Sequence, residues 1–130
     1  MTILIIDDDA GIRELVSLFL THKGYAAVGA RNGAEALAYL DQHRPLPDLI
    51  LLDLMMPDLD GWEVYQRLKS NPKTTHVPII VVTARAQSID KILGLHIAKV
   101  DDYITKPFSP SELIASIEKV LHKKNITPHN

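Results

Sequence analysis

Polar side chains follow several short apolar runs of this 130-residue sequence, at the point where each run ends. They are Asp7-Asp8-Asp9 after the first run, Asp53 at the end of the third, Thr83 at the end of the fourth, and Lys106-Pro107 after the fifth. If the first and third runs are neighbouring strands, their carboxylates converge. Two such charges about 5 Å apart repel by roughly 3 kcal/mol at an effective dielectric of about 20. A cation would remove this cost, and oxygen-only ligands favour a hard ion such as Mg²⁺.

Each of these residues also has an ordinary structural explanation. Acidic residues before a helix often only cap it, and an Asp at a strand end often only forms a turn. Pro107 can simply end a strand, whereas a cis peptide bond there would aim Lys106 inward. Their combination favours chemistry, because carboxylates, Mg²⁺, a Lys and a Thr are the groups needed to form and hold an acyl phosphate on an aspartate.

The elements that must position these residues alternate along the chain. The apolar runs predict strands at 3–6, 25–30, 49–52, 79–82 and 103–105. Three of these runs are apolar at every position, which is typical of parallel strands covered by helices on both faces.

Segments with a helical repeat follow each strand, at 12–19, 37–40, 64–68, 89–96 and 113–121. Asn32 with Glu35, and Ser109 with Glu112, are predicted capping boxes, and Gly24 is a predicted helix end. Five successive strand–helix units predict an α/β fold with helices on both faces of a parallel sheet.

The composition excludes several classes of protein. A net charge of −2 gives no general attraction to nucleic acid or to an anionic membrane, and the absence of cysteine excludes disulfides and thiolate metal sites. No apolar run reaches the ~20 residues of a membrane-spanning helix, and no signal peptide is evident. We therefore expect one cytoplasmic domain over residues 1–124, with 125–130 as a tail or the start of a linker.

Four segments together resemble the receiver domain of two-component response regulators: 3–9, 53–61, 82–84 and 101–108. The resemblance covers about residues 1–123. It implies a flavodoxin-like, doubly wound fold whose five parallel strands lie in the order 2-1-3-4-5. It also implies a signalling module, not a free-standing enzyme, that receives a phosphoryl group from a sensor histidine kinase or a phosphotransfer protein.

The resemblance assigns roles at the acidic end of the sheet. Asp53 matches the phosphoacceptor. Asp8 and Asp53, with the backbone carbonyl of Met55, match the ligands of Mg²⁺, for which Mn²⁺ could substitute, and Asp7 would act through water. Asp9 has no family role at the metal, and we interpret it as a helix N-cap.

The resemblance assigns further residues to the phosphorylated state. Lys106 and Thr83 should contact phosphoryl oxygens, and Thr83 with Tyr103 should form a switch that alters the surface of the fourth helix, fifth strand and fifth helix. Met55 and Arg85 match the positions that govern hydrolysis. Because a thioether orients water poorly and Arg85 could shield the phosphoryl group, we expect the aspartyl phosphate to be hydrolysed more slowly than in chemotaxis-type receivers.

The sequence departs from the family pattern at two places. Lys99 stands where a glycine usually ends the turn before the fifth strand. Receivers that form homodimers through the fourth helix, fifth strand and fifth helix carry a basic residue at the position of Ser116. Lys91 and Asp101 fit such a dimer, but this charge set is incomplete.

Two other classes of protein share parts of this pattern. A haloacid-dehalogenase-type phosphohydrolase needs an Asp as general acid at the position of Met55. This sequence has methionine there and so lacks that proton-transfer group. In a flavodoxin-type electron carrier the acidic triple would repel the flavin phosphate. The six histidines lack the spacing of a zinc helix.

Overall fold

The computed structural model describes residues 1–54, 56, 61–83 and 100–129, which form an alternation of strands and helices. In chain order the elements are β1 (Thr2–Ile6), α1 (Ala10–His22), β2 (Ala26–Ala30), α2 (Gly33–Gln42), β3 (Leu49–Asp53), α3 (Gly61–Ser70), β4 (Ile79–Thr83), β5 (Asp102–Thr105) and α5 (Pro110–His129). All five predicted strands are present, and the predicted helix at 89–96 lies outside the described residues.

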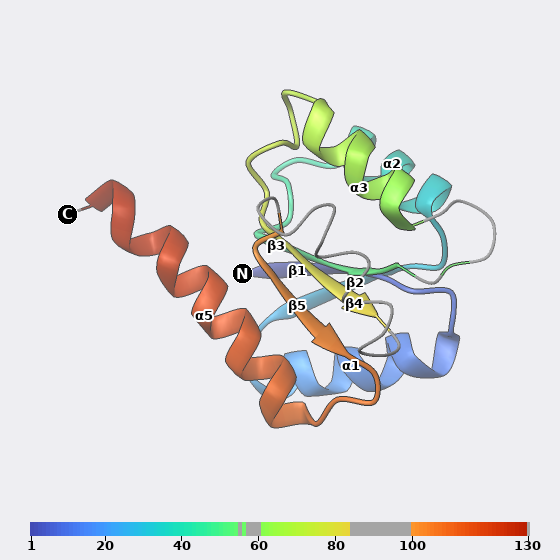
Figure 1. The fold of residues 1–130 in the computed structure, drawn as a ribbon, viewed down its shortest axis with the longest axis vertical. Coiled ribbons are helices and arrows are strands. Elements are labelled where there is room, and N and C mark those ends of the chain that lie inside the picture. The colour runs from blue at the N-terminus through green and yellow to red at the C-terminus, as the bar shows by residue number, and fades with distance from the viewer. Residues whose placement is uncertain (55, 57–60, 84–99, 130) are drawn as a thin grey trace.

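The strands form one parallel sheet in the order β2-β1-β3-β4-β5, which confirms the predicted topology. Ile6 pairs with Leu52, Asp53 with Val82, and Thr83 with Thr105. This register brings the carboxyl ends of β1, β3, β4 and β5 to one edge of the sheet (Figure 1).

Helices cover both faces of the sheet, α2 and α3 on one side and α1 and α5 on the other (Figure 1). Side chains alternate between the two layers along each strand. Leu4 and Ile6 belong to the core under α2 and α3, whereas Ile3 and Ile5 belong to the core under α1 and α5. Because both faces are dry, the central strands need apolar residues at every position, which explains the uninterrupted runs in the sequence.

The helix starts follow the predicted capping chemistry. A side-chain oxygen accepts a backbone N–H of the first turn at each predicted N-cap, Asp9, Asn32 and Ser109. Glu112 completes the box at α5 by accepting the Ser109 N–H at 2.9 Å. Glu35 differs from the expected box, because its carboxylate accepts the N–H of Arg31 rather than that of Asn32.

The helix ends agree less uniformly with the sequence. Gly24 follows α1 with φ of +91°, the left-handed conformation that favours glycine. In contrast, α5 continues to His129 through the segment expected as a tail or linker, where the sequence offers no glycine to end it. Among the described residues, no helix is both long and apolar enough to cross a membrane.

Candidate functional site

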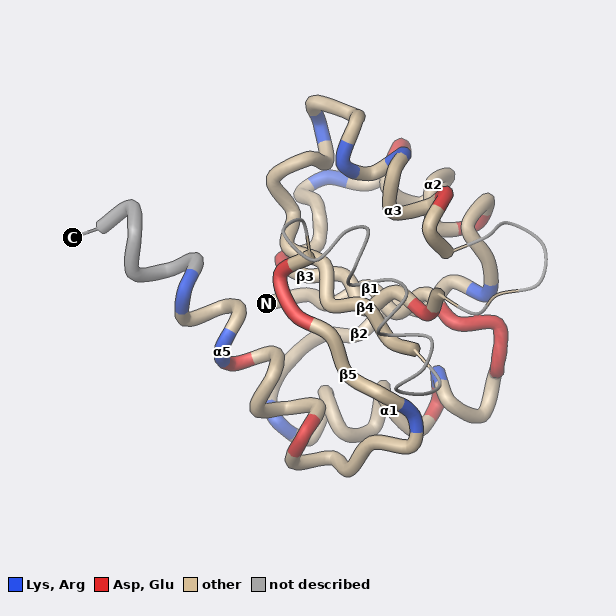
Figure 2. The backbone as a smooth tube through the Cα atoms, viewed as in Figure 1, with Lys and Arg blue, Asp and Glu red and all other residues tan. Residues whose placement is uncertain are grey.

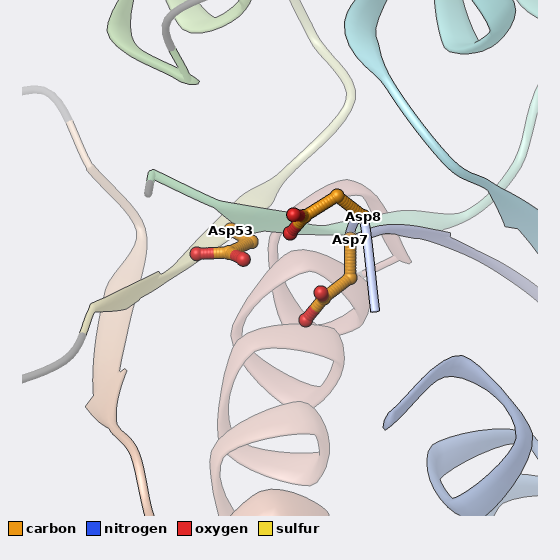
Figure 3. A group of neighbouring side chains, drawn as sticks. All are labelled: Asp7, Asp8 and Asp53. Carbon is orange, nitrogen blue, oxygen red and sulfur yellow. The ribbon is translucent and has the colours of Figure 1, made fainter. Parts of the chain in front are cut away.

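Three carboxylates meet at the carboxyl edge of the sheet, as the sequence predicts. Asp7 and Asp8 follow β1, and Asp53 is the last residue of β3 (Figure 3). One oxygen of each lies within 4.8 Å of the other two, with Asp7 and Asp53 buried and Asp8 exposed. The segment joining β1 to α1 is acidic along its length (Figure 2).

The carboxylate of Asp7 is held in place at both oxygens. Its Oδ1 accepts the backbone N–H of Asp9 at 2.9 Å, and its Oδ2 accepts the Lys106 ammonium at 2.8 Å. The same Asp9 caps α1, so the turn after β1 both starts the helix and orients Asp7. No hydrogen bond or ion pair of the Asp8 side chain is found within the described part of the chain, which leaves its oxygens available to a ligand.

Lys106 is the cation that lies between the two buried carboxylates. Its Nζ is 2.8 Å from Asp7 Oδ2 and 3.3 Å from Asp53 Oδ2. Partial burial alone would lower the pKa of Lys106, but the hydrogen bond to Asp7 and the charges of Asp53 and Asp7 outweigh it, so the net pKa is raised. The backbone N–H of Lys106 donates to Thr83 O at 2.8 Å, and the Lys106–Pro107 peptide bond is cis, as the sequence suggested.

Thr83 presents a dry hydroxyl at the same edge of the sheet. The residue is only 1% exposed, and its Oγ1 has no hydrogen-bond partner among the residues that the structure describes. An unsatisfied buried hydroxyl costs about 1–3 kcal/mol. At this edge of the sheet, Thr83 therefore keeps a hydroxyl donor for which the described residues supply no acceptor oxygen.

This donor set fits a hard divalent cation and an anionic group together. Asp8 and Asp53 offer carboxylate oxygens of the kind that Mg²⁺ or Mn²⁺ prefers. Lys106 and the unpartnered Thr83 offer N–H and O–H donors, which suit phosphoryl oxygens.

Sequence reasoning missed the packing of Gly61 at the start of α3. A Cβ at this position would lie 2.4 Å from Leu54 Cα and 2.6 Å from the Asp53 carbonyl oxygen. Only glycine therefore lets α3 begin directly against the backbone that carries Asp53. The signal was present in the segment 53–61, which ends on this glycine.

Tyr103 lies on β5 and is 40% exposed. Its partner in the strand register is Val81, two residues before Thr83. The two residues of the predicted switch thus lie on adjacent strands. The remaining predicted positions, Met55 and Arg85, lie outside the described residues.

Acidic residues of the predicted dimer face are engaged within the chain. Ser116 donates to Asp102 Oδ2 at 2.6 Å, and the Lys119 ammonium is 3.4 Å from the same oxygen. Asp101 Oδ2 accepts the backbone N–H of Ile79 at 2.8 Å. The two other positions singled out from the sequence, Lys91 and Lys99, lie outside the described residues.

Comparison with known proteins identifies the class that this fold and site define. Residues 3–118 match the family model of the response regulator receiver domain, so the chain belongs to that family. Over 122 residues it is 46% identical to the phosphate regulon transcriptional regulatory protein PhoB of Pseudomonas aeruginosa, covering 94% of this chain and 52% of that protein. It is 45% identical over 123 residues to the probable transcriptional regulator ycf27 of Guillardia theta, covering 95% and 46%. The chain thus spans about half the length of these relatives.

Solved structures agree with this assignment. The signal receiver domain of a signal transduction histidine kinase from Syntrophus aciditrophicus superposes with a TM-score of 0.85 at 32% identity, covering 99% of this chain and 96% of that one. A putative response regulator from Chloroflexus aurantiacus gives a TM-score of 0.82 at 36% identity, covering 93% and 97%. Receiver domains are signalling modules of two-component systems that generally bind Mg²⁺ and interact with sensor kinases.

Proposed function

We propose that Asp53 accepts a phosphoryl group from a phosphohistidine on a sensor kinase or phosphotransfer protein, in a Mg²⁺-dependent reaction. The observation that carries this proposal is the surroundings of the Asp53 carboxylate. It is buried and lies 3.3 Å from the Lys106 ammonium. It shares its edge of the sheet with the Thr83 hydroxyl, which has no hydrogen-bond partner among the described residues. A phosphoryl group attached to Asp53 would be negatively charged, and these two residues offer it a positive charge and a hydrogen-bond donor.

The proposed transfer is a displacement at phosphorus. An oxygen of Asp53 forms the new P–O bond while the P–N bond to the donor imidazole breaks, and the imidazole leaves with the electron pair and takes up a proton. Lys106 then contacts one phosphoryl oxygen and the Thr83 hydroxyl donates to another. The pairing of Lys106 with Asp7 keeps the ammonium at the site throughout.

The metal would be held by Asp8, Asp53 and the backbone carbonyl of Met55, with Asp7 acting through water. Mg²⁺ would neutralise the negative charge that gathers when a phosphate approaches three carboxylates, and Mn²⁺ could replace it. Asp8 is suited to this role because its carboxylate is exposed at the rim of the cluster.

Signalling would follow from the unpartnered hydroxyl. A phosphoryl group on Asp53 gives Thr83 its missing acceptor, and the movement of Thr83 vacates space into which Tyr103 turns from its exposed position. The surface of the predicted fourth helix, β5 and α5 would change with it and control a partner or an output domain. Two oligomeric states are compatible with this proposal. The partner is a second copy of the domain if a homodimer forms through that surface, whereas a monomeric receiver would bind a different protein or its own output domain.

The domain proposed here comprises residues 1–124, located in the cytoplasm with the kinases it serves. The relatives named above are transcriptional regulators of about twice this length. We propose that this domain, which carries a net charge of −2, does not itself bind nucleic acid.

The test is intact-protein mass spectrometry after incubation with phosphoramidate and Mg²⁺. One added phosphoryl group is expected, which should be absent in Asp53→Asn and after chelation of the metal. Asp41→Asn, which changes an exposed carboxyl on α2, is the matched control and should be labelled normally. Equal labelling of Asp53→Asn would contradict the proposal.

A further inference from the structure

Arg13 reaches back from α1 to the main chain of the acidic segment. Its Nη1 donates to the backbone carbonyl oxygen of Asp7 at 2.7 Å, in a partly buried contact. That carbonyl belongs to the peptide group linking Asp7 to Asp8. The Arg13 side chain therefore fixes the orientation of the peptide plane from which the Asp8 side chain departs.

The two carboxylates depend on this contact to different extents. The Asp7 side chain is already held by the Asp9 N–H and by Lys106. The Asp8 side chain has no such restraint within the described residues, so its direction is set by the backbone alone. Fixing the Asp7–Asp8 peptide is thus most important for aiming Asp8 toward Asp53.

The neighbouring edge strand leaves room for Arg13. Gly29 on β2 faces the side chain of Arg13, and a Cβ at Gly29 would lie 3.3 Å from Arg13 Cδ and 3.6 Å from Nε. Gly29 itself is exposed and has no unusual φ, so a larger side chain there would meet the Arg13 stem and not a core. Gly29 and Arg13 therefore act as a pair.

We propose that Arg13 is a positioning residue that aims Asp8 at the metal by holding the Asp7–Asp8 peptide, in the space that Gly29 leaves open. This inference rests on the proposed Mg²⁺ site. The change in Mg²⁺ affinity that it predicts for removal of Arg13 is opposite to the change expected from charge alone. A nearby guanidinium repels a divalent cation, so charge alone predicts tighter Mg²⁺ binding when Arg13 is removed, whereas loss of positioning predicts weaker binding.

The test is isothermal titration calorimetry with Mg²⁺ in the absence of any phosphodonor. Arg13→Ala should bind Mg²⁺ about tenfold more weakly, in the range that loss of outer-shell partners typically produces. Arg31→Ala is the charge control, because Arg31 is an exposed arginine paired with Glu35 at 3.3 Å. It should leave the affinity unchanged or slightly raise it.

Gly29→Val tests the same contact by a second route, because a side chain at position 29 should displace the Arg13 side chain from the Asp7 carbonyl. Valine favours strands, so urea unfolding in EDTA should show stability equal to or above that of the wild type, while Mg²⁺ affinity should fall severalfold. Ala26→Val at the other end of β2 is its control and should not change Mg²⁺ binding. Combined with Arg13→Ala, Gly29→Val should produce no further loss.

The outcomes separate this inference from the proposed function. If the wild-type chain binds Mg²⁺ while Arg13→Ala or Gly29→Val binds it equally well or more tightly, the positioning role is wrong. If the wild-type chain binds no Mg²⁺, the proposed metal site fails, and this inference with it. Should Arg13→Ala not fold, Gly29→Val alone still decides.

Discussion

Replacing Lys106 with Met should expose how strongly this site depends on a cation. Methionine keeps much of the length and apolar character of the lysine stem but removes the ammonium that lies 2.8 Å from Asp7 and 3.3 Å from Asp53. We expect the variant to be less stable than the wild type without Mg²⁺, and to regain most of the difference when Mg²⁺ is added.

The expected magnitude follows from the two distances. At 2.8 Å and 3.3 Å and an effective dielectric of about 20, each pair contributes roughly 5–6 kcal/mol of attraction before desolvation is subtracted. Removing one partner of a fully buried pair costs about 3–5 kcal/mol, whereas an exposed pair contributes about 0–1 kcal/mol. The Lys106 side chain is 26% exposed, so solvent screens it in part. We therefore expect a loss of about 2–3 kcal/mol.

Urea unfolding at increasing Mg²⁺ concentrations measures both effects. Mg²⁺ at a hundred times its dissociation constant stabilises a protein by about 2.7 kcal/mol. Lys106→Met should gain more than the wild type, because the substitution removes one positive charge that would otherwise repel the metal ion. Lys119→Met is the control, since Lys119 lies 3.4 Å from Asp102 on the surface and its loss should cost under about 1 kcal/mol at any Mg²⁺ concentration. A stability difference for Lys106→Met that does not depend on Mg²⁺ would refute the reasoning.

Three further predictions concern switching, lifetime and pH. Thr83→Ala should still permit phosphorylation of Asp53, but phosphorylation should no longer change the surface around Tyr103. NMR signals around Tyr103 that respond to phosphorylation as in the wild type would contradict the switch. Met55→Asn combined with Arg85→Glu should speed dephosphorylation in Mg²⁺ about tenfold, which corresponds to ~1.4 kcal/mol of barrier, and an unchanged half-life would show that neither side chain guards the site. Burial, then a nearby carboxylate, raises the pKa of Tyr65 from 10.0 to about 12. The folded state thus retains a proton that the unfolded state releases, and the free energy of unfolding should fall as pH rises from 10 to 12, more steeply than in Tyr65→Phe.

The sequence was sufficient for the architecture because the pattern reflects burial directly. A strand such as Leu49–Asp53, which is buried at every position, must be apolar until it reaches the polar edge, and it ends there on Asp53. The N-caps at Asp9 and Asn32 were predictable for a similar reason, since capping is a local interaction over two or three residues.

Contacts between distant elements were not predictable in this way. The approach of Gly61 to the Asp53 backbone and the bond from Arg13 to the Asp7 carbonyl depend on how helices dock on the sheet. Local sequence patterns do not predict how the helices pack against the sheet. The same holds for Ser116, which the sequence showed only as a missing basic residue and which the fold pairs with Asp102.

Phosphorylation of Asp53 itself is the central claim, and locating the phosphoryl group tests it most directly. Borohydride reduction of an aspartyl phosphate yields homoserine, so peptide mass spectrometry after reaction with phosphoramidate and Mg²⁺ identifies the modified residue. We predict homoserine at position 53 only, in wild-type protein and not in protein incubated with EDTA. Homoserine at position 7 or 8, or none at all, would contradict the account.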